Sequence, residues 1–293
     1  MSSDILAGRL RAVVPITQEL IFDLPMRQAR SGMAIILGLR LEKGEAKVAG
    51  YDLDVATKTS TPLKARRGKA RLRSWLRWIA LGIAALWLLA ALALVGLRWI
   101  DPPTTAVQAE RRMQAWFQPG VHGKPYRERY EFVPLREISP NLQHAVVSAE
   151  DARFYLHHGF DWHQVQIDAA GDLEGGQVRG ASTITQQLVK NLFFGTGRSI
   201  LRKGAEASLV PVAELVLGKR RILELYLNEV EWGPGVYGAE AACRYHYGVS
   251  ARNIGRDQAA RLAAILPAPR KRRPQRMNRY SEIILGRMGQ VGW

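Results

Sequence analysis

The sequence predicts a mostly α-helical domain preceded by a single transmembrane helix. The chain has 293 residues, of which 47% are hydrophobic and 23% charged, enough for one large globular domain with an appendage. An uncharged apolar stretch covers residues 78–97, and after Asp101–Pro103 apolar residues recur at helical spacing between glycine-bearing loops. No alternation of strands and helices is visible, so a parallel-sheet fold is not expected.

The transmembrane helix is predicted by residues 78–97, WIALGIAALWLLAALALVGL, which Arg77 and Arg98 flank. At about 1.5 Å rise per residue the stretch reaches about 30 Å, the thickness of a bilayer's hydrocarbon core. A buried core helix would carry a polar stripe, and a cleaved signal peptide would need a charged region of about seventy residues. Seven basic side chains lie within residues 64–77, whereas Arg98 alone follows before Asp101, which favours a cytoplasmic N terminus and a domain outside the cytoplasm.

Residues 1–77 are expected to form a cytoplasmic tail that ends in a basic linker. Apolar residues within 33–55 indicate strands, and the polar segment TKTSTPLKARRGKA follows them. A small folded module and a poorly ordered tail both fit this composition, and no function is assigned to it. The tail is longer than an anchor requires, so the true start of the protein stays open.

The net charge of +16 is shared by the two parts of the chain. Residues 1–101 carry 16 basic and 8 acidic side chains, and residues 102–293 carry 26 and 18. A basic domain tethered to a membrane favours anionic lipid headgroups or phosphates as partners, and the anchor argues against nucleic acid. Cys243 is the single cysteine, which excludes an internal disulfide and a cysteine-rich metal site and makes it a candidate core residue.

The first chemically informative stretch is SAEDARFYLHHGFDW, residues 148–162. Ser139 before Pro140 is a typical helix start, so we expect a helix that runs into this stretch. Glu150, Phe154 and His157 would then share one face at the boundary between core and cleft, where partial desolvation raises a carboxylate's pKa toward a value suited to a general base. Beside them the apolar positions should form a buried stripe: Leu142, Ala145, Val146, Ala149, Ala152 and Leu156.

Each of these residues also has a structural interpretation. An isolated Glu-Asp pair is more often a surface ion pair, a lone phenylalanine is more often core, and His157 and His158 would more often be structural hydrogen-bonders. The second stretch, GASTITQQLVKN at residues 180–191, changes that balance. It predicts a helix start with free N–H donors, followed by Lys190 as a mobile positive charge for phosphate, although such a stretch alone is an ordinary helix N terminus.

Two further segments complete the pattern. RSILRKGAEASLVPVAELV places Arg198, Arg202 and Glu206 four residues apart with Lys203 adjacent, which alone would be a surface salt-bridge ladder. KRRILELYLNEVEWGPGVYGAEAACRYHYG, residues 219–248, predicts an amphipathic helix, a glycine loop and a second helix ending near Gly248. Core positions in it are Ile222, Leu223, Tyr226 and Leu227.

The C-terminal segment is expected to end the packed domain. Pro267 and Pro269 should close the last packed helix. The cluster RKRR at residues 270–273 that follows is either a solvated face or a contact with the membrane surface.

Taken together, these segments closely resemble the family 51 peptidoglycan glycosyltransferases. The resemblance covers roughly residues 104–293 and rests on five motifs in the family's order and spacing: EDARFYLHHG, GASTITQQLVKNLFF, RKGAE, KRRILELYLNEVEWG and GPGVYGAEAA. One departure is His246, which separates two tyrosines where the family usually has an aromatic pair and should alter packing only. Bifunctional penicillin-binding proteins add a transpeptidase domain with a serine nucleophile and a lysine three residues on. With 45 residues left after Gly248, a monofunctional enzyme without transpeptidase activity is expected.

The resemblance implies a lysozyme-like, mostly helical fold with a membrane-proximal lobe, anchored in the cytoplasmic membrane with its catalytic domain in the periplasm. It implies polymerisation of lipid II into β-1,4-linked glycan strands, with inversion at the donor carbon and release of undecaprenyl pyrophosphate. Implied partners are lipid II, the growing strand, membrane lipids and cell-wall synthesis proteins, not nucleic acid. No cofactor is required and no metal ligand is assigned, although Mg²⁺ or Mn²⁺ is compatible with the sequence.

The family's functional residues map onto matching positions of this chain. Glu150 would act as the base, and Glu206 would orient basic groups, assist a divalent ion or position the acceptor. Lys190, Arg198 and Arg202 would stabilise the departing pyrophosphate. The remaining substrate-binding candidates are Asp151, Phe154, His157, Ser182, Thr183, Gln187, Asn191 and Lys203.

Two other classes of function remain as alternatives to the glycosyltransferase. A lysozyme-like hydrolase would use one carboxyl of raised pKa as an acid on finished glycan, but it would need no cations for a pyrophosphate. A noncatalytic anchor of the wall-building machinery would need neither Glu150 nor Glu206. Only an activity measurement excludes the anchor.

Overall fold

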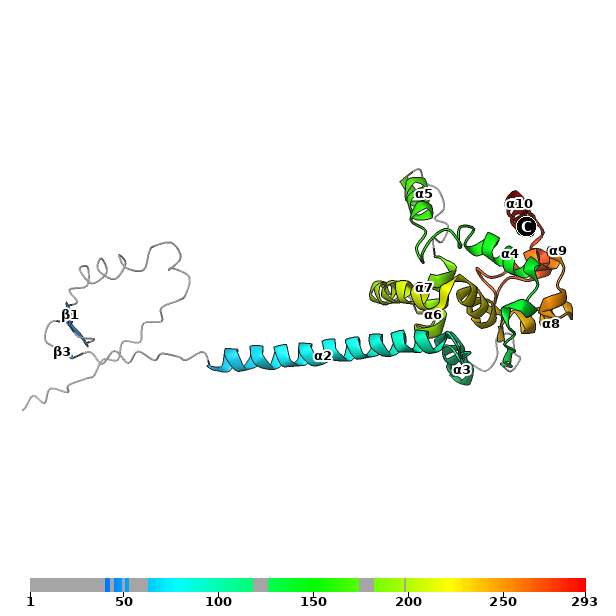
Figure 1. Cartoon of the computed structure of the whole chain (residues 1–293). Helices are drawn as coiled ribbons and strands as arrows, with labels where there is room; N and C mark the ends of the chain where they lie inside the picture. The colour runs from blue at the N-terminus through cyan, green and yellow to red at the C-terminus, as the bar shows by residue number, and fades with distance from the viewer. Residues whose placement is uncertain are drawn as a thin grey trace, which may run out of the picture. The chain divides into compact units, whose positions relative to one another are not determined.

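A computed structural model of the whole chain describes residues 40–42, 45–48, 51–52, 63–117, 126–173, 182–197 and 199–293 (Figure 1). The chain divides into two compact units, Met1–Leu72 and Arg73–Trp293. In the first unit, β1 (Arg40–Glu42), β2 (Glu45–Val48) and β3 (Tyr51–Asp52) form an antiparallel sheet in the order β1-β2-β3. Leu41 and Val48 lie in the strands that the sequence indicated; the residues before Arg40 lie outside the described part.

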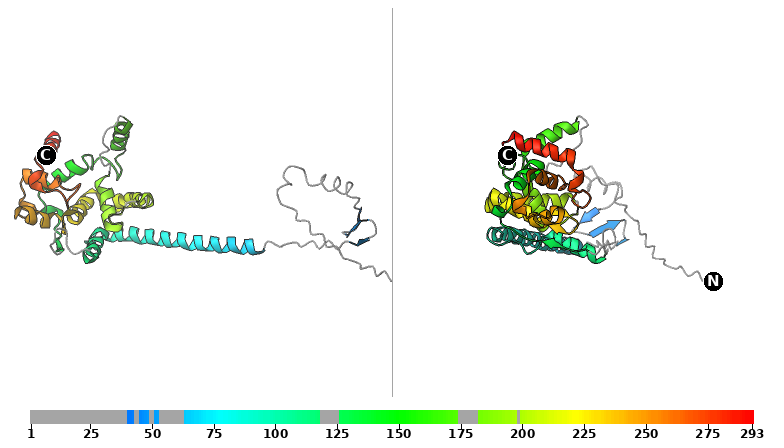
Figure 2. Two further views of the ribbon diagram at one scale, coloured as in Figure 1. Left: turned by 180° about the vertical axis from the view of Figure 1, so that it is seen from behind. Right: turned by 90° about the vertical axis from the view of Figure 1, so that its right-hand side faces the viewer.

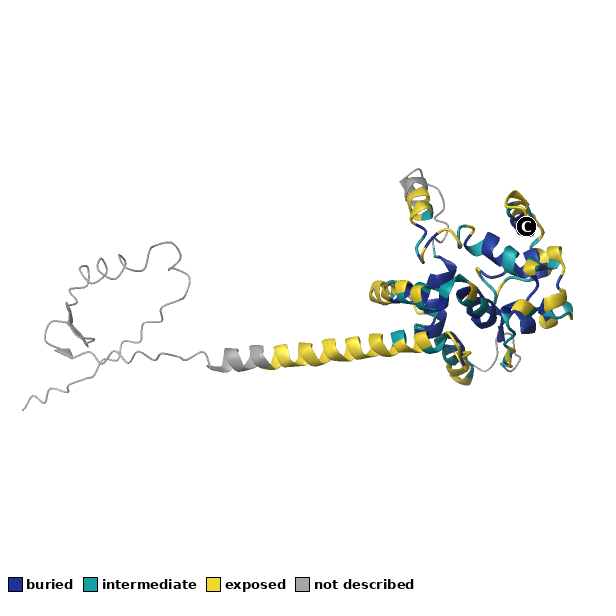
Figure 3. Cartoon of the chain, in the orientation of Figure 1, coloured by how far each residue is buried: buried dark blue, intermediate teal, exposed yellow. Residues whose placement is uncertain are grey.

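The long helix α2 (Leu63–Gly96) contains the predicted membrane span and begins earlier, in the basic segment. Its candidate membrane-spanning part, Arg71–Gly96, is long enough to cross a membrane and includes an 18-residue stretch with a mean hydropathy of 2.5. Large apolar side chains along it are exposed, as the run of exposed residues in Figure 3 shows. A core helix would bury such residues, so the exposure fits a helix whose solvent is lipid.

The second unit is mostly helical, as the sequence predicts. Figure 2 shows its helices around the C-terminal end of α2. They are α3 (Ala106–Phe117), α4 (Pro140–Glu150), α5 (Trp162–Leu173), α6 (Ile184–Phe193), α7 (Ile200–Glu229), α8 (Ala239–Tyr247), α9 (Arg256–Ala263) and α10 (Asn278–Gln290), with short 3₁₀ turns η2 (Leu135–Glu137), η3 (Ala251–Asn253) and η4 (Pro274–Arg276).

A small sheet in this unit was not predicted. β4 (Arg129–Tyr130), β6 (Val236–Tyr237) and β5 (Glu231–Gly233) form it in the order β4-β6-β5, with β4 parallel and β5 antiparallel to β6. The segment predicted as a glycine loop thus forms two short strands. Gly235, at φ 74°, lets the chain turn between them, and a Cβ there would lie 2.7 Å from the Arg127 carbonyl oxygen.

The core lies where α6 packs on α7 and where α4 packs on α9 and α10. Two sequence predictions are confirmed here: the four core positions of residues 222–227 and Cys243 are all buried. The segment that contains Glu206 and the amphipathic helix predicted from residue 219 onward both lie in α7. The helix is kinked between them at Gly218, where φ is 70°. The kink therefore falls at a residue without a Cβ.

Two predicted helix boundaries are wrong. α4 ends at Glu150, not near Leu156, because Asp151 leaves the helical conformation and its side chain binds the next segment. Ala152 and Leu156 are consequently exposed rather than part of a buried stripe. Pro267 and Pro269 do not end the packed domain either, since α10 follows and packs on α9 and α4 through buried Ile284 and Met288.

Candidate active site

Glu150 occupies the last turn of α4 and is partly buried. Its Oε2 accepts a hydrogen bond of 2.8 Å from Gln187 Nε2 on α6. Gln187 Oε1 in turn accepts one of 3.0 Å from the Tyr226 hydroxyl on α7. Three helices therefore hold one carboxylate oxygen, and the bond from Tyr226 fixes which way the Gln187 amide points.

The environment of Glu150 favours its protonated form. Burial raises the pKa of its carboxyl above the usual range, and the neighbouring charge of Asp151 adds to this. The Gln187 hydrogen bond and the positive charges of Lys190 and Arg272 act in the opposite direction without reversing the shift. A carboxyl whose pKa is raised in this way is a stronger proton acceptor, once deprotonated, than an exposed carboxylate.

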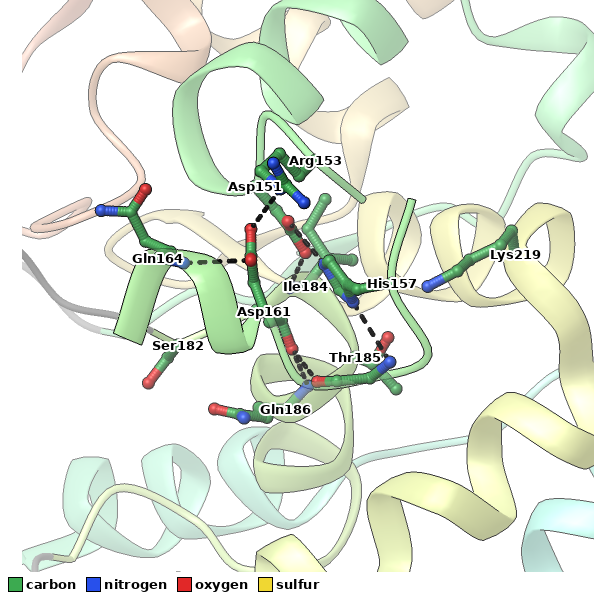
Figure 4. Close-up of polar contacts among 12 residues, drawn as sticks. Asp151, Arg153, His157, Asp161, Gln164, Ser182, Ile184, Thr185, Gln186 and Lys219 are labelled. Carbon is green, nitrogen blue, oxygen red and sulfur yellow. Dashed lines mark hydrogen bonds and ion pairs between the residues drawn. The ribbon is translucent and has the colours of Figure 1, made fainter. Parts of the chain in front are cut away.

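Asp151, the next residue, has a different environment (Figure 4). Its Oδ1 lies 2.9 Å from His157 Nε2, and its Oδ2 accepts a hydrogen bond of 3.0 Å from the Ile184 amide at the start of α6. His157 Nδ1 accepts from the Gly159 amide at 3.2 Å, so the ring proton lies on Nε2 and is donated to Asp151. Both carboxylate oxygens and both ring nitrogens are thus used in joining two segments of the fold.

Thr183 belongs to the same structural cluster. It caps α6 by accepting from the Gln186 amide at 3.2 Å and donates its own proton to the Gly159 carbonyl at 2.7 Å. The sequence predicted Asp151, His157 and Thr183 as substrate contacts. The structure places all three in buried positions that hold the loop after α4 against the start of α6.

Asp161 brings a third potential metal ligand to this cluster. One ligand atom each from Asp151, His157 and Asp161 lie within 4.8 Å of one another. However, Asp161 Oδ1 accepts from the Gln164 amide at 3.1 Å and Oδ2 lies 3.3 Å from Arg153 Nε (Figure 4). A cation would have to displace that guanidinium and the His157 proton, so these donors do not fit a metal site.

A second group of charges gathers where α6 meets the first turns of α7. Glu206 is buried between Arg202 Nη1 at 2.5 Å and Lys203 Nζ at 3.7 Å. Lys203 also lies 3.5 Å from both the Ser182 hydroxyl and Gln186 Oε1. Two of the basic residues predicted to act together, Arg202 and Lys203, are therefore neighbours held by one carboxylate.

Lys190 interacts electrostatically with both groups of charges. Burial lowers the pKa of its ammonium, and the positive charges of Arg202 and Lys203 lower it further. The carboxylates of Glu206 and Glu150 oppose this shift. Lys190 is thus coupled electrostatically to the candidate base and to the basic cluster.

Two predicted site residues are buried, and a third lies outside the described residues. Phe154 is fully buried, with Lys219 Nζ 4.4 Å from its ring centroid, so it packs in the core and offers no surface to a substrate. Asn191 is buried on α6. Arg198 lies outside the described residues.

Sequence reasoning missed two contributors to the site. Tyr226 was predicted only as core, but its hydroxyl orients Gln187. Arg272 was assigned to a solvated or membrane-facing cluster, yet its Nη1 donates to the Ala264 carbonyl at 2.9 Å and its charge lowers the pKa of Glu150. No local pattern marks either role, because both depend on packing between distant segments.

Comparison with known proteins shows the family of this chain. Residues 120–289 match the model of the transglycosylase family. The biosynthetic peptidoglycan transglycosylase of Pseudomonas entomophila (strain L48) is 46% identical over 226 residues, which are 76% of this chain and 91% of that protein. The enzyme of the same name from Pseudomonas aeruginosa is 46% identical over 188 residues, 64% of this chain and 79% of that protein. The chain therefore belongs to the transglycosylase family, which confirms the resemblance that its motifs indicated.

Proposed function

We propose that this protein is a monofunctional, membrane-anchored peptidoglycan glycosyltransferase that polymerises lipid II into β-1,4-linked glycan strands. The observation that carries the proposal is that Lys190 interacts electrostatically both with Glu150, a desolvated carboxyl, and with the cluster of Arg202, Lys203 and Glu206. A base and a set of cations coupled in this way suit a reaction that removes a proton from one sugar and expels a pyrophosphate from another.

In the proposed reaction Glu150 takes the proton from the 4-hydroxyl of the acceptor's N-acetylglucosamine. That oxygen attacks C1 of the donor's N-acetylmuramic acid from the face opposite the leaving group. The C1–O bond to pyrophosphate breaks, its electron pair leaves on undecaprenyl pyrophosphate, and the α-linked donor becomes a β-1,4 linkage. The raised pKa of Glu150 makes its carboxylate a stronger base than an exposed one.

The leaving pyrophosphate would be neutralised by Lys190, Arg202 and Lys203, with Arg198 as the fourth cation of the motif. Glu206 holds Arg202 and Lys203, so their charges need little reorganisation when the bond breaks. Ser182, which Lys203 approaches at 3.5 Å, and Gln187 border the same region. Glu206 would be the residue to assist a divalent cation, which would supply further positive charge to the departing pyrophosphate.

The position of α7 supports a lipid-linked donor. Trp87 Nε1, inside the apolar part of α2, donates to the Ser208 hydroxyl of α7 at 2.9 Å. Ile200, Leu201 and Leu215 on the same half of α7 are 91%, 89% and 85% exposed. If α2 spans the cytoplasmic membrane with its basic end inside, these side chains contact lipid on the same half of α7 that carries the cationic cluster.

A lysozyme-like hydrolase explains less of the site. Cleavage of a neutral glycosidic bond creates no pyrophosphate, so the clustered cations would have no partner. The growing glycan strand and other proteins of wall synthesis are the remaining expected partners. Transpeptidase activity is not part of the proposal.

The test is an assay of detergent-solubilised protein with labelled lipid II, with products resolved by length, beside Glu150→Gln. Polymer that muramidase degrades, formed by the unaltered protein alone, supports the transferase and its base. Absence of polymer across detergents and divalent ions would overturn the proposal in favour of a noncatalytic or partner-dependent protein.

A further inference from the structure

Helix α3 (Ala106–Phe117) exposes three large apolar side chains on one face. Val107 and Gln108 are buried, whereas Met113, Trp116 and Phe117 are 58%, 89% and 84% exposed. The exposed three are spaced i, i+3, i+4, so they share one face, and at 3.6 residues per turn that face lies opposite the buried pair. A surface helix of a globular protein has the reverse arrangement.

The charged side chains of α3 are all bound to the domain. Glu110 accepts from the amide and the hydroxyl of Thr196, both at 2.5 Å. Arg112 makes two hydrogen bonds of 2.6 Å to Glu128. Arg111 lies 3.4 Å from Glu231 and donates to Gln114 at 2.7 Å. These contacts fix how α3 is rotated, so the exposed apolar face is a consequence of the fold.

The apolar face of α3 continues the surface of α2. Trp99 and Ile100, directly after α2, are 72% and 67% exposed, and α3 follows a few residues later. Arg221 holds this junction through the Leu97 and Ile100 carbonyls at 2.8 and 3.1 Å. Figures 1 and 2 both show α3 beside the end of α2. Tryptophan and phenylalanine at the end of a membrane span are typical of the interface between headgroups and acyl chains.

We infer that α3 is a further membrane contact beside α2 and α7, which lies on the outer leaflet of the bilayer and inserts Met113, Trp116 and Phe117 at the interface. The inference rests on the proposal that α2 spans that bilayer. Contact of α3 with the bilayer would fix the height and the tilt of the domain relative to the membrane, because a single transmembrane helix can tilt within the bilayer. An exposed apolar face that continues the surface of a membrane span is complementary to lipid, so lipid alone can cover it.

The inference can be tested by spin labelling of the full chain in vesicles of phosphatidylethanolamine and phosphatidylglycerol. Phe117→Cys carries the label; Cys243 is fully buried and so does not compete for it. Leu86→Cys, within α2 and 69% exposed, is the reference for lipid, and Val291→Cys, at the end of α10 and 56% exposed, is the reference for water. Accessibility to oxygen and to a water-soluble nickel chelate is compared at each site.

The quantity compared is the ratio of oxygen accessibility to chelate accessibility. This ratio should be several-fold higher for the label at position 117 than for the label at position 291, and lower than for the label at position 86. A ratio at 117 equal to that at 291 overturns the inference, and protection from both reagents overturns it in favour of a protein partner. A water-like ratio at 86 overturns the membrane span as well. Met113→Cys, on the same face, repeats the test if the first variant does not fold.

Discussion

Glu150 and Asp151 are adjacent carboxylates that differ in their hydrogen-bond partners, although burial raises the pKa of both. Glu150 has one oxygen bound by the Gln187 amide, while the charges of Lys190 and Arg272 oppose the rise of its pKa. Asp151 has both oxygens bound, one by an imidazole and one by a backbone amide. This difference indicates that one motif can contain a carboxylate that is available for chemistry and a second that holds the loop around it. The predictions for Glu150 and Asp151 below test these two roles separately.

The largest effect is expected for Glu150→Gln. The amide keeps the shape of the side chain and a hydrogen-bonding group but cannot accept the proton, so polymerisation should fall by about 10²- to 10⁴-fold while lipid II binding is largely kept. Initial rates and binding are measured with labelled lipid II. The control is Glu137→Gln, an exposed glutamate outside the site. Unchanged turnover in Glu150→Gln would show that another group is the base.

Lys190→Ala should have the next largest effect. The substitution removes a cation that interacts electrostatically with Glu150 and with the cluster of Glu206, so binding of lipid II and turnover should both weaken. Turnover should fall by about 10²- to 10³-fold if Lys190 stabilises the leaving pyrophosphate. Steady-state kinetics with lipid II measure both effects. The matched control is Lys271→Ala, an exposed lysine. Equal kinetics in both variants would refute the assignment to pyrophosphate.

Asp151→Asn should act mainly on stability. An amide offers one acceptor oxygen, so either the His157 Nε2 proton or the Ile184 amide faces an NH₂ group and loses its hydrogen bond. The expected loss is about 1–3 kcal/mol of unfolding free energy, measured by denaturant titration in detergent. Asp257→Asn, an exposed i,i+4 partner of Arg261, is the control. A variant of native stability with no activity would instead place Asp151 in the chemistry.

The smallest effect is a shift in pH dependence. The Gln187 hydrogen bond favours the charged form of Glu150, so Gln187→Met should raise the pKa of that carboxyl further. A base must be deprotonated to act, and the acid limb of kcat/KM should therefore move to higher pH. The profile is compared with that of Tyr226→Phe, which keeps the amide and should shift less. An unmoved acid limb would mean that Glu150 does not set it.

The main features of the fold could be predicted from local patterns. Ser139 before Pro140 marks the start of α4, and Ser139 does cap it by accepting from the Asn141 amide at 3.3 Å. The apolar stretch of α2 and the buried positions of residues 222–227 follow from hydropathy and helical period alone. These features depend on residues close in sequence, where spacing determines which side chains share a face.

Tertiary contacts decided the rest, because they depend on energies that no local pattern contains. The spacing of residues 142–156 predicts a longer helix, but α4 stops at Glu150, where Asp151 binds His157 and the start of α6. The position of Arg272 near Glu150 and the bond from Tyr226 to Gln187 join segments that are far apart in the chain. The sequence by itself thus determined the family, the span and the candidate charges. Only the tertiary structure decided which carboxylate is left for chemistry, because burial and partners arise when distant segments pack.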